Sequence, residues 1–318
     1  MTAPSPGGTG PSLVSPFGVQ MRSIGALLAV VLLPLGVSAQ GIATVTLLEG
    51  SLKLIRGANV LQGLEGVQLR QGDILESSAS GFVQVEFPGG TIVVLGPSSK
   101  AFVFRAGSGR DGARGAKEPD TNLILLSGWL KGESTSTAGL YRYSTPALAA
   151  ESGNGAVVVH FDGGGCDVNF ESGSGAIGEI STDGSWHEAY GAKGGQFFSR
   201  REGKGVNTSS HPSASFVSAM PGAFMDTLPS RLAHYRGKRA PEPRPDHLVS
   251  YADVQPWLTL PSAWRRGFVE RFESRLKDAE FRRQMEEHLA QYPEWDPVLH
   301  PEKYKQGTQP AVNNNSPQ

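Results

Sequence analysis

The sequence predicts a mainly β fold of stacked or sandwiched short strands, followed by a small helical C-terminal segment. Short runs of alternating apolar residues, separated by glycine-bearing turns, fill residues 42–105 and continue over residues 121–200. Glycine contributes 41 of the 318 residues, well above its usual share, which suits many tight turns. After residue 247 the apolar spacing changes to the pattern typical of helices.

The strand pattern is clearest around residue 85. Val83 and Val85 alternate with Gln84 and Glu86, which predicts one buried face and one face in water. A proline–glycine turn then returns the chain as the strand 91–95. We expect strand 91–95 to be an edge strand, to which a partner protein can add a strand; the alternative is that the loop 106–120 caps this edge.

Glycine–aspartate pairs mark further turns. In Gly72-Asp73 the glycine tolerates a positive φ, and the carboxylate can accept hydrogen bonds from nearby backbone N–H groups. Asp162-Gly163 and Asp183-Gly184 are typical of hairpin turns. The segment 128–130 resembles the segment 50–52, but no fixed period predicts a true repeat.

The order of these turns resembles that of the bacterial FecR domain. The family pattern is a Gly-Ser opening, a Gly-Asp turn, a hairpin closed by Gly-Gly-Thr, and a strand that ends in Leu-Gly-Pro before a serine. The matching residues here are Gly50, Gly72, Asp73, Gly81, Gly89, Gly90, Pro97 and Ser99. The resemblance implies a sensing domain of the bacterial periplasm. In the regulators of this family, a cytoplasmic domain passes the signal to a sigma factor.

The N-terminal region predicts export. Residues 1–20 are uncharged and rich in Pro, Gly and Ser, and Met21 is as suitable a start as Met1. Arg22, an apolar run and small residues before Ala39 form a signal-peptide pattern, with cleavage expected after Ala39. The alternative is a membrane anchor, but the apolar run 24–37 is shorter than the roughly 20 residues of a bilayer span. We expect a periplasmic or cell-surface protein without an integral membrane span.

The function that follows is a non-catalytic binding or sensing module, whose partner is a protein or a cell-envelope component. Only about twenty residues precede the apolar run, so the chain departs from the regulator pattern of its family. The first alternative is nevertheless a signalling component of a cell-surface signalling system. The second is an exported hydrolase, with a site assembled from distant residues such as His160, Asp162 and Glu171.

Composition and motifs give little support for the binding of a cofactor or of nucleic acid. Without residues 1–39 the chain has 28 basic and 30 acidic side chains, a net charge of −2 (29 − 1 − 30). The stretches 107–112 and 173–178 match G-x-G-x-x-G but lack the strand and helix that a phosphate site needs. No histidine pair has the short spacing of a metal site. Cys166 has no disulfide partner, and its surroundings favour burial over dimerisation.

The C-terminal segment is predicted to be helical. Ser250 and Asp253 form a capping-box pattern, and a second helix is expected to start near Pro261. Spaced aromatic residues on one face predict either a small local core or a face that contacts a partner. The residues of this face are Trp264, Phe268 and Phe272, with Trp295 in a tail expected to fold back.

The predicted organisation divides the chain into five parts. The Pro-rich basic stretch is interpreted as an extended, soluble hinge and not as a site for lipid headgroups or nucleic acid. The parts are an N-terminal extension with signal peptide (1–39), a FecR-like β domain (41–235), a Pro-rich linker (236–246), a helical segment (247–305) and a disordered tail (306–318).

Overall fold

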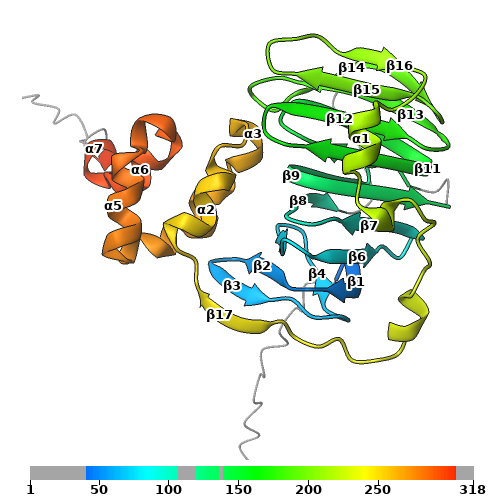
Figure 1. The fold of residues 1–318 in the computed structure, drawn as a ribbon. Coiled ribbons are helices and arrows are strands. Elements are labelled where there is room, and N and C mark those ends of the chain that lie inside the picture. The colour runs from blue at the N-terminus through cyan, green and yellow to red at the C-terminus, as the bar shows by residue number, and fades with distance from the viewer. Residues whose placement is uncertain (1–40, 107–118, 136–138, 306–318) are drawn as a thin grey trace, which may run out of the picture. The chain divides into compact units, whose positions relative to one another are not determined.

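The computed structural model describes residues 41–106, 119–135 and 139–305 (Figure 1). In these residues, hydrogen bonds join seventeen strands into one mixed sheet, and the helices all follow residue 213. The prediction of a mainly β fold with a small helical C-terminal segment is therefore confirmed. Three predictions concern residues outside the described ones, namely the signal peptide and extension (1–39), the glycine motif at 107–112 and the tail 306–318.

The continuous sheet is folded into two layers, because β9 (Thr121–Ser134) and β11 (Leu148–Phe161) each belong to both. Layer 1 runs in the order β4 (Gln68–Leu69), β1 (Ala43–Glu49), β6 (Phe82–Glu86), β7 (Thr91–Leu95), the second halves of β9 and β11, β12 (Gly165–Phe170), β15 (Phe197–Arg201) and β16 (Asn207–Ser209). Layer 2 runs in the order β17 (Arg244–Leu248), β3 (Asn59–Gln62), β2 (Leu52–Arg56), β5 (Ile74–Ser77), β8 (Lys100–Ala106), the first half of β9, β10 (Tyr141–Ser144), the first half of β11, β13 (Ser174–Ile180) and β14 (Trp186–Lys193).

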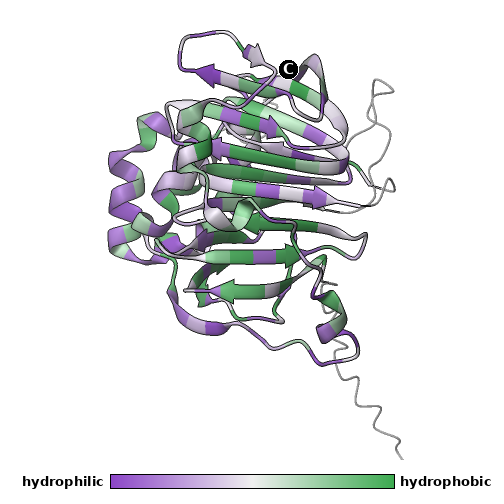
Figure 2. Cartoon of the chain, turned by 45° about the vertical axis from the view of Figure 1, so that its right-hand side comes forward, coloured by the Kyte–Doolittle hydropathy of each residue, from purple (hydrophilic) through white to green (hydrophobic). Residues whose placement is uncertain are grey.

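The main hydrophobic core lies between the layers. Inward-facing residues alternate with outward-facing ones along each strand, so both layers contribute apolar side chains. Figure 2 shows these apolar residues along the strands of the stack. The fully buried members include Val45, Leu54, Val83, Leu125, Leu130, Val157, Val168 and Phe170. Cys166 belongs to this core as a free thiol, which confirms its predicted burial, and burial raises its pKa to about 12.

A glycine and a serine hold β9 where it changes layer. Gly128 has a φ of +92°, and a Cβ there would lie 2.4 Å from the Ser99 Oγ. The next residue, Trp129, donates its backbone N–H to the Ser99 Oγ at 2.8 Å, and the hydroxyl donates back to the Trp129 carbonyl at 3.0 Å. Only glycine combines this backbone conformation with so close an approach. We call this pair a Gly–Ser latch.

The same latch occurs at two other changes of layer. Gly155 in β11 has a φ of +83°, and the following N–H of Ala156 donates to the Ser172 Oγ at 3.0 Å. Between β1 and β2, Gly50 has a φ of +75°, and the following N–H donates to the Ser78 Oγ at 3.2 Å. In each latch the serine hydroxyl accepts a hydrogen bond from a backbone N–H that, at the bend, no longer pairs with a neighbouring strand.

Replacing Gly128 with alanine should lower the free energy of unfolding by at least about 2 kcal/mol, because the positive φ and the contact with Ser99 both oppose a Cβ. Chemical denaturation of the purified protein measures this change. Gly191→Ala is the matched control, since Gly191 lies in β14 with open space around its Cβ position and no positive φ. Equal stability of the two variants would contradict the role of the latch.

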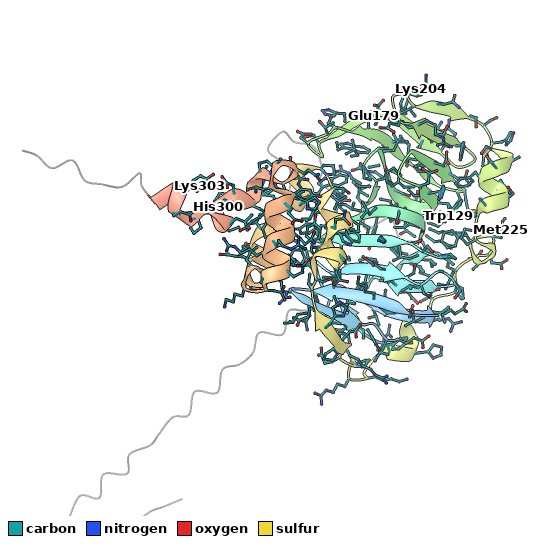
Figure 3. The ribbon with its side chains drawn as sticks, turned by 60° about the vertical axis from the view of Figure 1, so that its left-hand side comes forward. Trp129, Glu179, Lys204, Met225, His300 and Lys303 are labelled. Carbon is teal, nitrogen blue, oxygen red and sulfur yellow. The ribbon has the colours of Figure 1, made fainter. Side chains whose placement is uncertain are left out.

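The outer face of layer 1 is covered by residues 213–232. This segment contains α1 (Ala214–Ala219), η1 (Gly222–Phe224) and the start of η2 (Leu232–Tyr235). Its residues Phe216, Phe224 and Leu228 pack with Trp129 and Val158 of the sheet. Figure 3 shows Trp129 on the strands beneath this cover, whereas the nearby Met225 is 56% exposed.

The water-facing side predicted for β6 is instead buried by this cover. Gln84 and Glu86 are 1% and 3% exposed, so that prediction was wrong. The Glu86 carboxylate accepts hydrogen bonds from the Ser230 hydroxyl and the Arg231 N–H, both at 2.6 Å. Burial alone would raise the pKa of Glu86, but these bonds and one from Thr46 hold it below its ordinary value. The buried charge thereby fixes the covering segment to the sheet.

Two further predictions need correction. Strand 91–95 is not an edge, because β7 pairs with β6 on one side and with β9 on the other. The stretch 236–246 is not a free hinge, because β17, which starts at Arg244, pairs with β3. A proline in an edge strand costs no hydrogen bond if its nitrogen faces away from the sheet, and this allows Pro245 within β17.

The helical segment packs on the outer face of layer 2. The capping box of Ser250 and Asp253 starts α2 as predicted. The helix predicted from Pro261 is divided at Gly267 into two short helices and a 3₁₀ turn. The elements are α2 (Tyr251–Leu258), α3 (Ser262–Arg265), α4 (Phe268–Phe272), η3 (Glu273–Lys277), α5 (Ala279–Glu287), η4 (Leu289–Gln291), η5 (Pro293–Trp295), α6 (Asp296–Leu299) and α7 (Pro301–Lys305).

Candidate functional site

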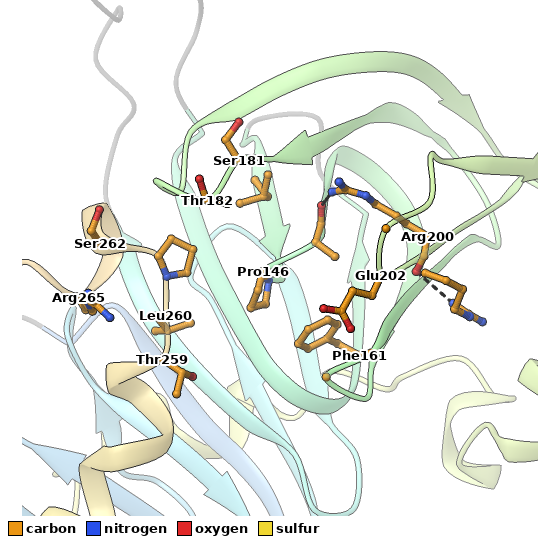
Figure 4. Close-up of a pocket in the computed structure, with 17 residues that line it drawn as sticks. Pro146, Phe161, Ser181, Thr182, Arg200, Glu202, Thr259, Leu260, Ser262 and Arg265 are labelled. Atoms are coloured by element: carbon orange, nitrogen blue, oxygen red, sulfur yellow. Dashed lines mark hydrogen bonds between the residues drawn. The ribbon is translucent and has the colours of Figure 1, made fainter. Parts of the chain in front are cut away.

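A cleft of about 550 Å³ lies where the helical segment meets one end of the two layers (Figure 4). Its volume is within the usual range of small-molecule sites. One wall comes from turns and strand ends of the β domain, at residues 146–147, 163–164, 180–182 and 200–203. The other wall is the connection between α2 and α3, at residues 259–262, together with Arg265. The cleft therefore needs both parts of the chain.

Hydrogen bonds join the two walls directly beside the cleft. The indole N–H of Trp264 donates to the Gly184 carbonyl at 3.1 Å, and the backbone N–H of Ala263 donates to the Asp183 carbonyl at 3.2 Å. Gly184 has a φ of +91° and lies where a Cβ would be 2.9 Å from the Trp264 ring nitrogen. This turn is the predicted Asp–Gly hairpin turn, and the structure shows that it also docks α3.

The cleft has an apolar floor. Phe161 from the end of β11 and Ile180 from the end of β13 are 6% and 5% exposed. Leu260 closes the floor from the helical side and is 1% exposed. Apolar contact area of this kind, with a few polar groups around it, is typical of ligand sites.

Three arginines line the cleft, and each already has an acidic partner. Arg200 lies 3.3 Å from Glu179 and donates to the Ala147 carbonyl at 2.7 Å. Arg265 lies 2.7 Å from Glu294. Because these guanidinium groups are compensated, the cleft carries no strong excess of positive charge.

The third arginine, Arg201, contacts Asp167 at 2.9 Å. Hydrogen bonding to Asp167 raises the pKa of Arg201 above its ordinary value. Burial acts to raise the pKa of Asp167, but the nearby His160 and the hydrogen bond from Arg201 outweigh it and lower that pKa. The pair is thus held in its charged form.

Several polar groups remain open to a ligand. The hydroxyls of Ser181, Thr182 and Ser262 make no hydrogen bond to another described residue, and Thr182 and Ser262 are exposed. The exposed Glu202 side chain makes no ion pair with a described residue. In Figure 4 these groups lie on opposite walls of the space. The cleft therefore offers hydroxyl donors and acceptors above an apolar floor.

The residues that resemble the FecR pattern lie away from the cleft and have structural roles. Gly50 and Ser99 belong to latches, and Gly90 turns the β6–β7 hairpin with a φ of +85°. Asp73 is buried, accepts the Arg70 N–H at 2.8 Å as predicted, and pairs with Arg56 at 2.6 Å. The other residues of this pattern are in turns or bends of the same region, namely Gly72, Gly81, Gly89 and Pro97.

The Gly72 turn also anchors the helical segment. Its carbonyl accepts from the Arg271 Nη1 at 2.5 Å, and the same guanidinium donates to the carbonyls of Ile55 at 2.7 Å and Gly57 at 3.0 Å. Burial lowers the pKa of Arg271 to about 10. A charged group with three carbonyl acceptors fixes α4 against β2 and the turn before β5.

The proposed partner-contact face is buried inside the protein. Trp264, Phe268, Phe272 and Trp295 are between 0% and 5% exposed and pack with layer 2 or with other helices. Phe268, for example, lies 5.4 Å from Phe102 of β8 between ring centroids. The partner-contact interpretation of this face is therefore replaced by that of a local core.

The residues considered for a hydrolase have separate structural partners. His160 stacks on Trp129 at 4.1 Å and lies 3.9 Å from Asp167. Asp162 accepts the backbone N–H groups of the Gly164–Gly165 turn, as a hairpin aspartate does. Glu171 pairs with Lys131 at 2.9 Å. The three are not brought together around one space.

In the part of the chain that the structure describes, no group of three or more His, Cys, Asp or Glu residues is arranged to hold a metal ion. No helix among the described residues is long and apolar enough to cross a membrane. The second glycine motif, at 173–178, lies in β13 and its preceding turn, without a following helix.

Comparison with known proteins gave limited similarity. No protein-family model matches the chain, and no curated protein matches it. Two crystal structures, each of a candidate anti-sigma factor from Parabacteroides distasonis ATCC 8503, are 12% identical to it, with TM-scores of 0.33 and 0.34. The matches cover 46% of this chain and 62% and 63% of theirs, so this chain spans less than two thirds of those proteins.

Sequence reasoning did not find the cleft. Two features beside it were predicted locally: the start of a helix at Pro261, which lines the cleft, and the hairpin turn at Asp183-Gly184, which bonds to α3 next to it. Nothing in the sequence indicates that these segments, about eighty residues apart, meet. Single Ser, Thr and Arg residues in turns carry no spacing signal that separates a ligand site from an ordinary surface.

Proposed function

We propose that this chain is a non-catalytic, exported FecR-domain protein, a binding or sensing module of the bacterial periplasm or cell surface. The observation that carries the proposal is the cleft between the β domain and the helical segment. Its ligand would be a component of the cell envelope.

The order of turn residues supports the FecR assignment. Gly50 and Ser99, two positions of the family pattern, act in Gly–Ser latches, so the pattern corresponds to a physical requirement of this fold. Asp73, a third position, is a buried turn aspartate paired with Arg56. A pattern of this kind specifies the scaffold and leaves the ligand to be argued from the cleft.

The chemistry of the cleft favours a hydroxyl-rich ligand. Compensated arginines do not attract a strongly anionic molecule, whereas the open hydroxyls of Ser181, Thr182 and Ser262 can exchange hydrogen bonds with sugar hydroxyls or peptide groups. The apolar floor around Phe161 suits the less polar face of a sugar ring. Peptidoglycan combines sugars with short peptides and is the envelope polymer that matches both properties.

A signalling role is a second candidate, and one observation favours it. Because the walls of the cleft belong to the β domain and to the helical segment, a ligand would favour the arrangement in which the two parts are docked. A ligand shifts a conformational equilibrium when it binds one arrangement more tightly than the other.

Export is tested by cell fractionation with N-terminal sequencing of the mature protein. We expect a periplasmic or extracellular product that begins at Gln40, because the small residues before Ala39 form a cleavage site. A product of the inner membrane that retains residues 24–37 would contradict cleavage and would support a membrane-anchored sensor.

Ligand binding is tested with soluble disaccharide-peptide fragments released from purified peptidoglycan. Thr182→Trp and Ser262→Trp each fill the cleft from a different wall. Each should weaken binding in calorimetry by about tenfold or more, a loss of about 1.4 kcal/mol. The fold should be kept, because both positions are exposed.

The matched control is Thr208→Trp, which adds the same side chain at an exposed position in the edge strand β16, outside the cleft lining. It should bind the fragments like the wild type. The proposal is contradicted if the wild type fails to bind any fragment, or if both cleft variants bind as tightly as the control.

A further inference from the structure

A basic segment, residues 231–244, runs along the end of the two layers formed by β1, β3 and β4, and we call it the basic strap. It is held in place along its length. Glu86 accepts the N–H groups of Arg231 and Leu232, and the Tyr235 hydroxyl donates to the Thr46 carbonyl at 3.1 Å. At its far end the strap enters β17, which pairs with β3.

Gly66 allows the strap to lie close to the sheet. Gly66 has a φ of +84°, and a Cβ there would lie 3.0 Å from the Pro241 ring and 3.2 Å from the Tyr235 ring. Pro241 and Tyr235 therefore pack against a position without a side chain. This arrangement is that of a fixed surface element and differs from the flexible hinge expected from its composition.

The strap carries a concentrated positive charge. Between residues 231 and 244 there are five cations and one acid, Glu242, a net charge of +4 (5 − 1) in a chain whose total is −1. All five cations are exposed, and none makes an ion pair with another described residue. They are Arg231, Arg236, Lys238, Arg239 and Arg244.

Three of these cations also border a cavity of about 320 Å³. Arg236, Lys238 and Arg239 line one side of it, and Thr44 and Gln68 of the β domain line the other. The cavity is large enough to accept a phosphate-bearing headgroup with its glycerol. Guanidinium and ammonium groups are the usual ligands of phosphate in proteins.

The strap lies at the end where the chain enters the described structure. The backbone of Gly41 approaches Gln68 closely, and Gln68 lines the same cavity. In the sequence, the apolar run 24–37 ends shortly before this point. The strap and the start of the described residues therefore lie at the same end of the two layers.

We propose that the basic strap binds the surface of a membrane that contains anionic phospholipid. A row of exposed cations along one end of the protein matches a broad, negatively charged surface, and the cavity provides a place for one headgroup. The proposal uses the proposed export only to choose lipid over nucleic acid, and it is independent of the cleft.

The test uses the exported form beginning at Gln40, which holds almost all of the compact unit 39–318. Co-sedimentation is measured with vesicles of phosphatidylcholine alone and with vesicles in which one third of the lipid is phosphatidylglycerol. We expect binding only to the anionic vesicles, and weaker binding as the salt concentration rises. The triple variant Arg236→Glu, Lys238→Glu, Arg239→Glu should bind about a hundredfold more weakly, because the loss of each cation is expected to weaken binding about fivefold.

The control variant Lys193→Glu, Lys204→Glu, Lys277→Glu makes the same change of net charge at exposed positions outside the strap. It should keep most of the vesicle binding. Equal binding by the two triple variants would show that only net charge matters and would overturn the proposal. Wild-type binding to neutral vesicles as tight as to anionic ones would overturn it as well, as would tighter binding to single-stranded RNA than to anionic vesicles.

Discussion

The two-layer fold depends on the points at which the chain passes from one layer to the other. At each of three such points, a glycine with positive φ is followed by a backbone N–H that donates to a serine hydroxyl, with Gly128 and Ser99 as the clearest example. A chain that passes between layers must lose ladder hydrogen bonds at the bend, and a donor without a partner is most costly where it is buried, as at Trp129. The serine supplies that partner, so the layers can share β9 and β11 without a gap in hydrogen bonding.

The latches leave two outer faces that must also be covered. Residues 213–232 cover layer 1, and the Glu86 carboxylate of that layer accepts backbone N–H groups of this covering segment. The helical segment covers layer 2, where Arg271 binds backbone carbonyls of β2 and its neighbouring turns. In both cases a buried charge on one part is paired with backbone groups of the other, which fixes position as well as providing stability. The cleft is formed where the second cover reaches the end of the layers.

Much of the fold could be predicted from the sequence, because strands, turns and caps have local signals. The alternation around Val85, the Asp–Gly turns and the capping box of Ser250 and Asp253 all correspond to observed elements. The errors concern long-range packing. Gln84 and Glu86 look like surface residues until the cover that buries them is known, and the partners of strand 91–95 include a strand about forty residues away. The cleft and the surface of the strap depend on such contacts, so the sequence alone did not show them.

Hydrogen-exchange mass spectrometry with and without peptidoglycan fragments tests the central claim that the cleft binds an envelope ligand through both of its walls. The account predicts slower exchange, on adding fragments, in peptides that cover residues 180–184 and in peptides that cover residues 259–265. Exchange in turns far from the cleft, such as that at Gly72, should stay unchanged. Slower exchange on one wall only, or only at sites away from the cleft, would contradict the account.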